Sequence, residues 1–210
     1  AAERAAGPGA YEGDILAEMH GAVFRGGGDD PANEFIIGSG SGALMCRYFT
    51  GRRRLDANDQ LTLEFAGTYR HYHACLMRTF LVGTLDPRLL DMHAACAEAL
   101  LAAEAALRPG TDLGAVFTAH ANALDAGGHA GNRLNACGYA LGATFAPNWM
   151  DWPMLYAGQP VEAQPGMVFF IHIILFDAER GLAMTLGRTS LVTAHGSEPL
   201  SRAAIEPVRC

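Results

Sequence analysis

Titratable side chains are concentrated in one apolar stretch, residues 63–83 (LEFAGTYRHYHACLMRTFLVG). Glu64, His73, Cys75 and Arg78 all fall within it. A carboxylate beside an imidazole can support general acid–base hydrolysis, and the same groups together with a thiol are zinc ligands. The stretch therefore predicts a half-buried site that performs chemistry, with or without a metal ion.

One further histidine interrupts the longest apolar run, residues 167–176 (MVFFIHIILF). An unpaired polar group inside an apolar strand costs free energy, so we expect His172 to have a function. The run is far shorter than the roughly 20 residues that a membrane span requires. It therefore predicts a buried strand that contributes one titratable group.

The elements that must position these residues follow from the apolar pattern. Alternation and turn residues predict a strand pair in each half of the chain, over residues 56–67 and 70–83 and over residues 166–176 and 181–198. Apolar residues at helical spacing predict helices over residues 10–23, 87–107 and 111–126. Residues 147–160 are expected to form a long aromatic loop.

The order of these elements defines the expected fold class. No internal sequence repeat is apparent, but each half offers helices followed by antiparallel strands. We therefore predict one α+β domain over residues 1–210, made of two similar halves with helices outside a curved sheet.

Composition excludes several classes of function. Half of the 210 residues are hydrophobic, 18% are charged, and the net charge of -7 comes without a basic stripe, so a nucleic-acid partner is not expected. The arginine cluster at residues 51–56 (GRRRLD) is interpreted as a solvated turn. No signal peptide or membrane anchor is visible, and the five cysteines include no CxxC pair. A cytoplasmic location is the simplest interpretation.

Five motifs in order give the chain a family resemblance. LTLEFAG, CLMRTFLVG, GYALG (residues 138–142), GMVFFIH (residues 166–172) and TLGRTSLVT (residues 185–193) resemble motifs of the superfamily of methionine aminopeptidase, prolidase and creatinase. The resemblance implies the "pita-bread" fold. It also implies a homodimer and an N-terminal domain that this chain lacks, so we interpret the chain as a fragment.

The resemblance also identifies the positions of the metal ligands, and here the chain departs from the peptidases. Those enzymes hold two metal ions with Asp, Asp, His, Glu and Glu; this sequence has Glu64, Cys75, Tyr139, His172 and Gly187. Two further family histidines fall at Ala146 and near Cys46 or Arg47. A dinuclear hydrolase needs bridging carboxylates. The resemblance therefore implies the metal-free branch, which includes creatinase and ectoine hydrolase, and we predict no cofactor.

Strand alternation then assembles a pocket around these positions. Residues two apart share a face, so Glu64, His73, Cys75, Tyr139 and His172 are predicted to converge. We predict Met77, Phe170, Arg188 and Trp149, together with Cys75, as substrate-binding residues. Within the catalytic set, His172 or His73 would be the base, Glu64 would anchor a substrate cation, and Tyr139 would donate to an oxyanion.

Alternatives remain open for several of these residues. Either histidine could be a structural core residue, and Cys75 could be a small hydrophobic residue or a nucleophile. Arg78 is expected to hold the sheet together through buried contacts. Arg188 replaces a family Asp and could bind a substrate carboxylate. Glu64, His73, Cys75 and His172 could also bind a single metal ion.

Three functions fit this pattern. The leading prediction is a metal-independent hydrolase of C–N bonds in a small nitrogen-containing solute. The second is an Xaa-Pro dipeptidase with an altered metal site, and the third is an inactive binding module. We expect a small-molecule substrate as the partner, and neither a nucleic-acid nor a membrane partner.

Overall fold

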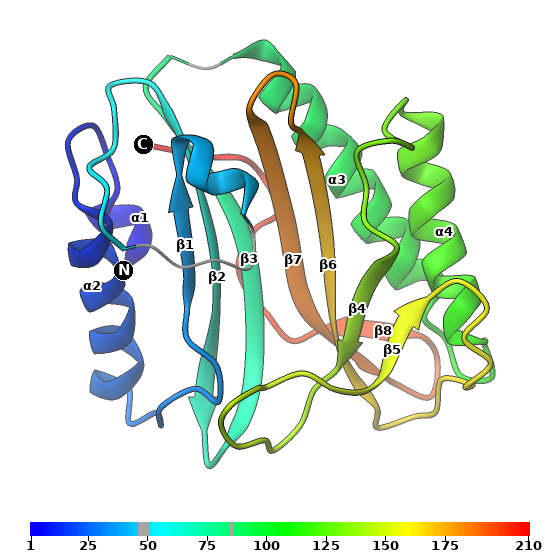
Figure 1. The fold of residues 1–210 in the computed structure, drawn as a ribbon. Coiled ribbons are helices and arrows are strands. Elements are labelled where there is room, and N and C mark those ends of the chain that lie inside the picture. Colours follow the sequence, from blue (N-terminus) through cyan, green and yellow to red (C-terminus); the bar gives the residue numbers. More distant parts are fainter. Residues whose placement is uncertain (46–50, 85) are drawn as a thin grey trace.

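The computed structural model describes residues 1–45, 51–84 and 86–210, and these form one curved sheet with helices at its outer side (Figure 1). The described strands run in the order β1-β2-β3-β7-β6-β4-β5, with β8 beside β7 and β9 beside β3. The helices are α1 (Ala2–Ala5), α2 (Glu12–Arg25), α3 (Pro87–Ala106) and α4 (Leu113–Ala126), with a 3-10 helix η1 (Gly40–Leu44). The strands are β1 (Ile36–Ser39), β2 (Asp59–Tyr69), β3 (Tyr72–Val82), β4 (Ala136–Ala140), β5 (Asp151–Tyr156), β6 (Val168–Asp177), β7 (Leu182–Val192), β8 (Ser197–Pro199) and β9 (Val208–Arg209).

The long helix α3 shows how the sequence builds the outer layer. Asp86 caps it by accepting a hydrogen bond from the Arg88 amide, and Pro87 occupies the first turn, where a missing N–H costs nothing. The buried stripe of α3 covers the outer face of β6 and β7, so that Phe169 and Ile171 are fully buried. Burying such a stripe contributes most of the stability of an amphipathic helix.

The predicted fold class and the predicted halves are confirmed. α1, α2 and β1–β3 form one half, and α3, α4 and β4–β7 form the other. Among the described strands of the two halves, β3 and β7 are the only two that pair across the boundary, through the pairs Leu76↔Arg188, Met77↔Gly187 and Arg78↔Leu186. Two threonines reinforce this junction in matching ways.

The matching is visible in the hydrogen bonds at the junction. Thr189 Oγ1 accepts a bond of 2.7 Å from the Cys75 amide, and Thr79 Oγ1 accepts one of 2.8 Å from the Thr185 amide. The threonines stand at the same place in residues 78–82 (RTFLV) and 188–192 (RTSLV). The expectation of no internal repeat is therefore wrong: a short repeat becomes evident once the strand register is known.

The segment expected to be an aromatic loop contains strand β5, which the sequence analysis missed. β5 lies at the end of the sheet and pairs with β4 alone. An edge strand tolerates Pro153, because its missing N–H would face away from the ladder. The proline and the irregular register with β4 hide the alternation that would have predicted a strand.

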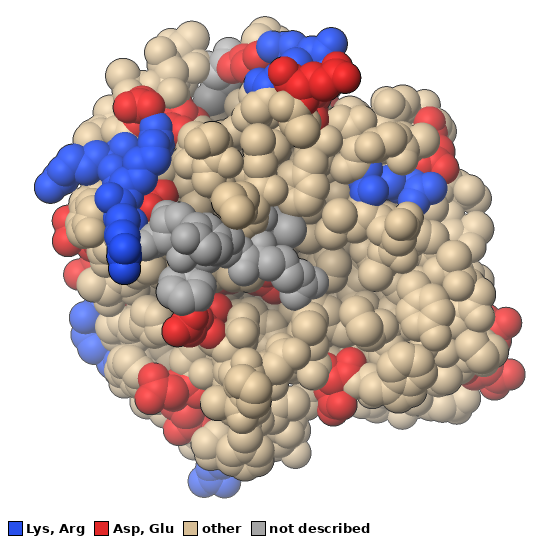
Figure 2. Space-filling view, in the orientation of Figure 1, with Lys and Arg blue, Asp and Glu red and all other residues tan. Residues whose placement is uncertain are grey.

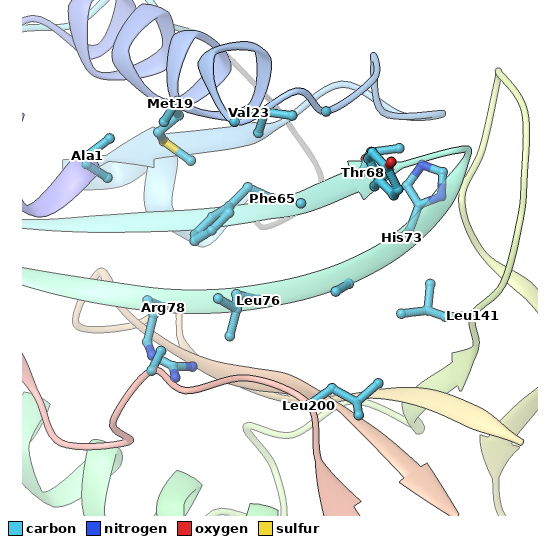
Figure 3. Close-up of a pocket in the computed structure, with 18 of the residues that line it drawn as sticks. Ala1, Met19, Val23, Phe65, Thr68, His73, Leu76, Arg78, Leu141 and Leu200 are labelled. Atoms are coloured by element: carbon cyan, nitrogen blue, oxygen red, sulfur yellow. The ribbon is translucent and has the colours of Figure 1, made fainter. Parts of the chain in front are cut away.

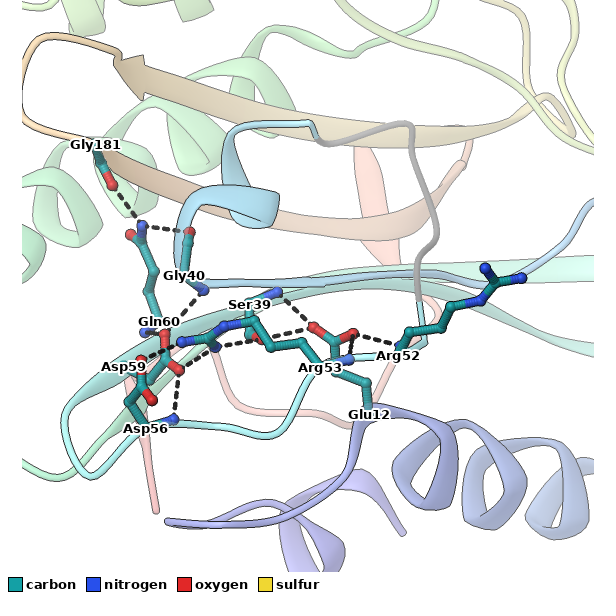
Figure 4. A network of polar contacts seen from close by, with 9 residues as sticks. All are labelled: Glu12, Ser39, Gly40, Arg52, Arg53, Asp56, Asp59, Gln60 and Gly181. Carbon is teal, nitrogen blue, oxygen red and sulfur yellow. Dashed lines mark hydrogen bonds and ion pairs between the residues drawn. The ribbon is translucent and has the colours of Figure 1, made fainter.

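A buried carboxylate fixes the start of α2 to the sheet (Figure 4). Glu12 accepts hydrogen bonds from the amide and hydroxyl of Ser39 and from the amides of Arg52 and Arg53. Arg53 also pairs with Asp56 and Asp59. The arginine cluster is therefore partly neutralised within its own turn.

Basic and acidic side chains are also mixed on the molecular surface. On the face shown in Figure 2, acidic groups accompany the basic groups at the rim. Within the described ranges, no helix is long and apolar enough to cross a membrane.

A buried histidine should make the fold sensitive to acid. His120 on α4 is 1% exposed, and burial, with Arg133 nearby, lowers its pKa from 6.5 to about 4. The unfolded chain therefore takes up a proton at a pH where the folded chain does not. The stabilisation is complete above pH 6.5 and is lost as the pH falls toward 4, on the order of 3 kcal/mol.

We expect His120→Met to remove much of this acid sensitivity, because methionine does not titrate. Urea unfolding at pH 7 and at pH 4.5 measures the free energy of unfolding for both proteins. The variant should lose less stability than the wild type over that interval. Parallel losses in the two proteins would contradict the assignment to His120.

Candidate active site

One row of residues crosses the junction on the sheet face opposite α3. The register places Glu64 beside Met77, Met77 beside Gly187, and Gly187 beside His172. These residues share a face, as strand alternation predicted. The row brings a carboxylate from one half and an imidazole from the other to the same side of the sheet.

The two titratable groups stand at matching distances from the junction. Glu64 and His172 each lie one strand away from the central pair Met77 and Gly187. Three strand spacings separate their Cα atoms by about 14 Å, since neighbouring strands lie about 4.8 Å apart. The Tyr139 side chain reaches both of them, through a hydrogen bond to Glu64 Oε1 and a ring contact with His172.

Tyr139 on β4 connects the two sides of the row. Its hydroxyl donates to Glu64 Oε1 at 3.1 Å and accepts from Trp149 Nε1 at 2.8 Å. Indole N–H is a donor only, so the single phenolic proton is directed at the Glu64 carboxylate. The Tyr139 ring also lies 5.6 Å from the His172 ring and 5.5 Å from the Phe170 ring, centroid to centroid.

These side chains are all buried. Glu64 is 1% exposed, Tyr139 is 0% exposed and His172 is 3% exposed. Met77, Phe170 and Trp149 are also buried and belong to the same apolar cluster. In such surroundings a carboxylate and an imidazole act on a ligand more strongly than they would in water. The structure thus brings together Glu64, Tyr139, His172, Met77, Phe170 and Trp149.

Cys75 lies on the same face, one row away, but its surroundings suppress thiolate chemistry. Its amide and carbonyl both bond to Thr189 Oγ1. Burial and the nearby Glu64 raise the pKa of its thiol well above 9.0. A nucleophilic cysteine needs a lowered pKa and access to solvent. Cys75 therefore resembles a small hydrophobic residue more than a nucleophile.

Both ring nitrogens of His73 are engaged by the loops around it. Its Nε2 accepts a hydrogen bond of 2.9 Å from the Ala32 amide, so the proton resides on Nδ1, which lies 3.2 Å from Thr144 Oγ1. Burial lowers its pKa below 6.5. With its lone pair occupied, His73 ties two loops together, and of the two candidate bases His172 is the better placed.

The two arginines beside the row lie on the outer face. Arg188 donates to both carboxylate oxygens of Glu104 at 2.8 and 2.6 Å, which places it on the side of α3 rather than with Glu64 and His172. Arg78 donates to the carbonyls of Met77 and Gly187 across the junction, as expected for a residue that holds the sheet together. The structure therefore does not bring Arg188 to the predicted pocket.

The donors at the five ligand positions do not suit a pair of metal ions. Gly187 offers no side chain, and a Cβ there would meet the Ile171 carbonyl at 2.8 Å and the Phe170 ring at 3.0 Å. The Tyr139 hydroxyl is used by its two neighbours, and the Cys75 thiol resists ionisation. One carboxylate, Glu64, cannot bridge two cations as a dinuclear centre requires.

A site for a single ion finds no support in the described part of the chain either. Among those residues, no three of His, Cys, Asp and Glu stand close enough to bind a metal ion together. Ala146 supplies no ligand. Cys46 and Arg47, the other positions considered, lie outside the described residues.

Threonines are the contributors that the sequence analysis missed. Thr79 and Thr189 join the halves, and Thr144 orients His73. The repeated Arg-Thr pair at residues 78–79 and 188–189 was the one available signal. Without the register, nothing indicated that these hydroxyls meet backbone amides of the opposite half.

Comparison with known proteins agrees with this architecture. A model of metallopeptidase family M24 matches residues 1–194. An ectoine hydrolase from Halomonas elongata is 28% identical over 183 residues, which are 86% of this chain and 44% of that protein. An Xaa-Pro dipeptidase from Pyrococcus furiosus is 21% identical over 194 residues, which are 92% of this chain and 54% of the dipeptidase.

A solved structure shows the same fold. Dipeptidase PepE from Mycobacterium ulcerans superposes with a TM-score of 0.88 at 24% identity, over 96% of this chain and 53% of that chain. The chain spans about half the length of the curated relatives it matches. The predicted pita-bread fold is confirmed, and the match to the family model over nearly all of the sequence shows that the chain belongs to metallopeptidase family M24.

Proposed function

We propose that this chain is the catalytic part of a metal-independent hydrolase that cleaves a C–N bond in a small nitrogen-containing compound. The observation that supports this most is the hydrogen-bonded series from Trp149 through Tyr139 to Glu64, which ends opposite His172. Glu64, Tyr139 and His172 stand at positions where the family resemblance places metal ligands. The similarity to an ectoine hydrolase is consistent with such a substrate.

His172 is the proposed general base. It accepts a proton from a water molecule, whose oxygen attacks the carbon of the amide or amidine. The tetrahedral intermediate collapses, the C–N bond breaks, and the imidazolium returns the proton to the departing nitrogen. An imidazole suits both steps because its ordinary pKa lies near neutrality.

Glu64 is the proposed anchor for a substrate cation. A charge-assisted hydrogen bond to a carboxylate is about twice as strong as a neutral one. Tyr139 acts as a positioning residue, because its proton already fixes the orientation of the carboxylate. Met77 and Phe170 belong to the apolar cluster around these groups and would supply apolar contacts to the ligand. The enclosed, apolar setting favours a compact substrate with one cationic end.

Replacing the base and the anchor should affect different kinetic constants. We expect His172→Ala to lower kcat about 10²- to 10⁴-fold, the usual contribution of general base catalysis. We expect Glu64→Gln to raise KM about 10- to 100-fold, because one charge-assisted bond is lost. Steady-state assays with ectoine, creatine and an Xaa-Pro dipeptide, each with and without chelator, measure both effects.

The controls separate this proposal from its competitors. Cys75→Ala should leave both constants near their wild-type values, since the thiol is not the nucleophile. Stoichiometric metal in the purified protein, with activity lost on chelation, would overturn metal independence and indicate a peptidase with an altered metal site. Ligand binding without turnover in the wild type would indicate a binding module.

Tyr139→Phe tests the positioning role. The change leaves the Trp149 N–H without its acceptor and removes a donor from Glu64, so we expect the free energy of unfolding to fall by about 1–3 kcal/mol. KM should rise while kcat changes little. Tyr156→Phe on the neighbouring strand β5 is the matched control. A fall in kcat with unchanged KM would instead mean that Tyr139 acts directly in the reaction.

A further inference from the structure

His73 stands at the end of the β2–β3 hairpin, where loops from both halves of the molecule meet. Figure 3 shows it on β3 beside Thr68 of β2, its direct partner in the strand register. Alternation along β3 places His73 on the same face of the sheet as Cys75 and Met77. Because Met77 pairs with Glu64, the imidazole lies on the face of the candidate active site, two rows away from that carboxylate.

Both loops that pass this end of the hairpin are bonded to His73. Ala32, in the loop between α2 and β1, donates its amide to Nε2 at 2.9 Å. Thr144 Oγ1, in the loop between β4 and β5, lies 3.2 Å from Nδ1, which carries the proton. Gly142 of the same loop accepts a bond of 3.2 Å from the His73 amide. With both ring nitrogens bonded, the imidazole is fixed in one orientation.

The loop that His73 holds leads to Trp149, five residues after Thr144. The Trp149 ring lies 6.1 Å from the His73 ring, centroid to centroid, at an angle of 50°. Trp149 is 1% exposed, and its indole N–H begins the hydrogen-bonded series through Tyr139 to Glu64. His73 therefore supports the first member of that series in two ways, through its loop and through its ring.

The exposure of this loop makes that support important. Residues 145–148 are all exposed, so the position of Trp149 depends on how the loop is held on either side of them. On the N-terminal side the hairpin holds it, because the Thr144 amide donates to the His71 carbonyl at 3.0 Å and Thr144 Oγ1 meets the His73 ring. A buried indole that moved away from its acceptor would leave its N–H unpaired, which costs free energy.

We propose that His73 is a positioning residue for the candidate active site. It fixes the loop and the ring of Trp149, and the indole N–H then fixes the Tyr139 hydroxyl. The hydroxyl orients the Glu64 carboxylate toward a substrate cation, a role that rests on the proposed function. Loss of the imidazole therefore weakens binding of the cation and leaves the proton transfer at His172 intact.

Three variants test this role by steady-state kinetics with ectoine, creatine and an Xaa-Pro dipeptide. His73→Leu removes both ring contacts, so we expect KM to rise about tenfold, the effect of one lost hydrogen bond, while kcat changes little. His73→Gln should restore a KM near the wild-type value, because its amide can accept from Ala32 and donate to Thr144. Thr68→Val is the matched control and should change neither constant, since Thr68 Oγ1 is buried without a hydrogen-bond partner in the described part of the chain.

A second measurement does not depend on turnover. The sequence has two tryptophans, so Trp152→Phe leaves Trp149 as the one source of an indole N–H signal in NMR spectra. We expect His73→Leu to speed the exchange of this proton with solvent about tenfold, because its bond to Tyr139 opens more often. Thr144→Val, at a partly exposed position, should act in the same direction. It tests the proposal even where His73→Leu does not fold.

A double-mutant cycle distinguishes positioning from packing. In the Tyr139→Phe background the series is already broken, so His73→Leu should raise KM no further, although it still lowers the free energy of unfolding. An equal rise of KM in both backgrounds would overturn the proposal. So would indole exchange that neither His73→Leu nor Thr144→Val changes. Absence of turnover in the wild type would count against the proposed function instead, and indole exchange would then decide the role of His73.

Discussion

The three residue pairs that join β3 to β7 are the constraint on which the rest of the structure depends. They are the only strand pairing between the two halves in the described sheet. Two threonine hydroxyls bonded to the amides of Cys75 and Thr185 reinforce the junction, and Arg78 bonds to carbonyls on both of its strands. Gly187 has no space for a side chain there. This tight pairing sets the curvature of the sheet and places Glu64 and His172 symmetrically around its centre.

The chemistry at the centre differs from what the fold commonly supports. A pair of metal ions needs several carboxylates around the junction, whereas this chain has one, and a glycine stands where another would be required. The side chains present form a hydrogen-bonded series, Trp149 to Tyr139 to Glu64, that fixes one carboxylate opposite an imidazole. Such an arrangement can bind a cation and move a proton. The fold therefore supplies the geometry, and the residues that stand at the ligand positions determine which chemistry the centre can support.

The sequence predicted those features that depend on residues close together in the chain, such as the alternation of side chains along a strand. Alternation along β2, β3 and β6 placed Glu64, Met77, Phe170 and His172 on one face, and the strand register agrees. Hydrogen-bond and ion-pair partners that lie far apart in the sequence could not be predicted from such a pattern. His73 fits the pattern, but the Ala32 amide engages its ring. Arg188 was chosen from the family resemblance; strand alternation with Gly187 places it on the outer face, where it pairs with Glu104 of α3.

The central claim is that one ligand contacts Glu64 and His172 from opposite halves of the molecule. Nitrogen-15 NMR of the histidine rings during titration with acetamidinium, a small cationic amidine, tests it directly. The account predicts that the His172 ring signals shift, that those of His73 and His120 do not, and that Glu64→Gln abolishes the shift. Signals of His172 that stay unchanged at saturating acetamidinium, or that shift equally in Glu64→Gln, would contradict the account.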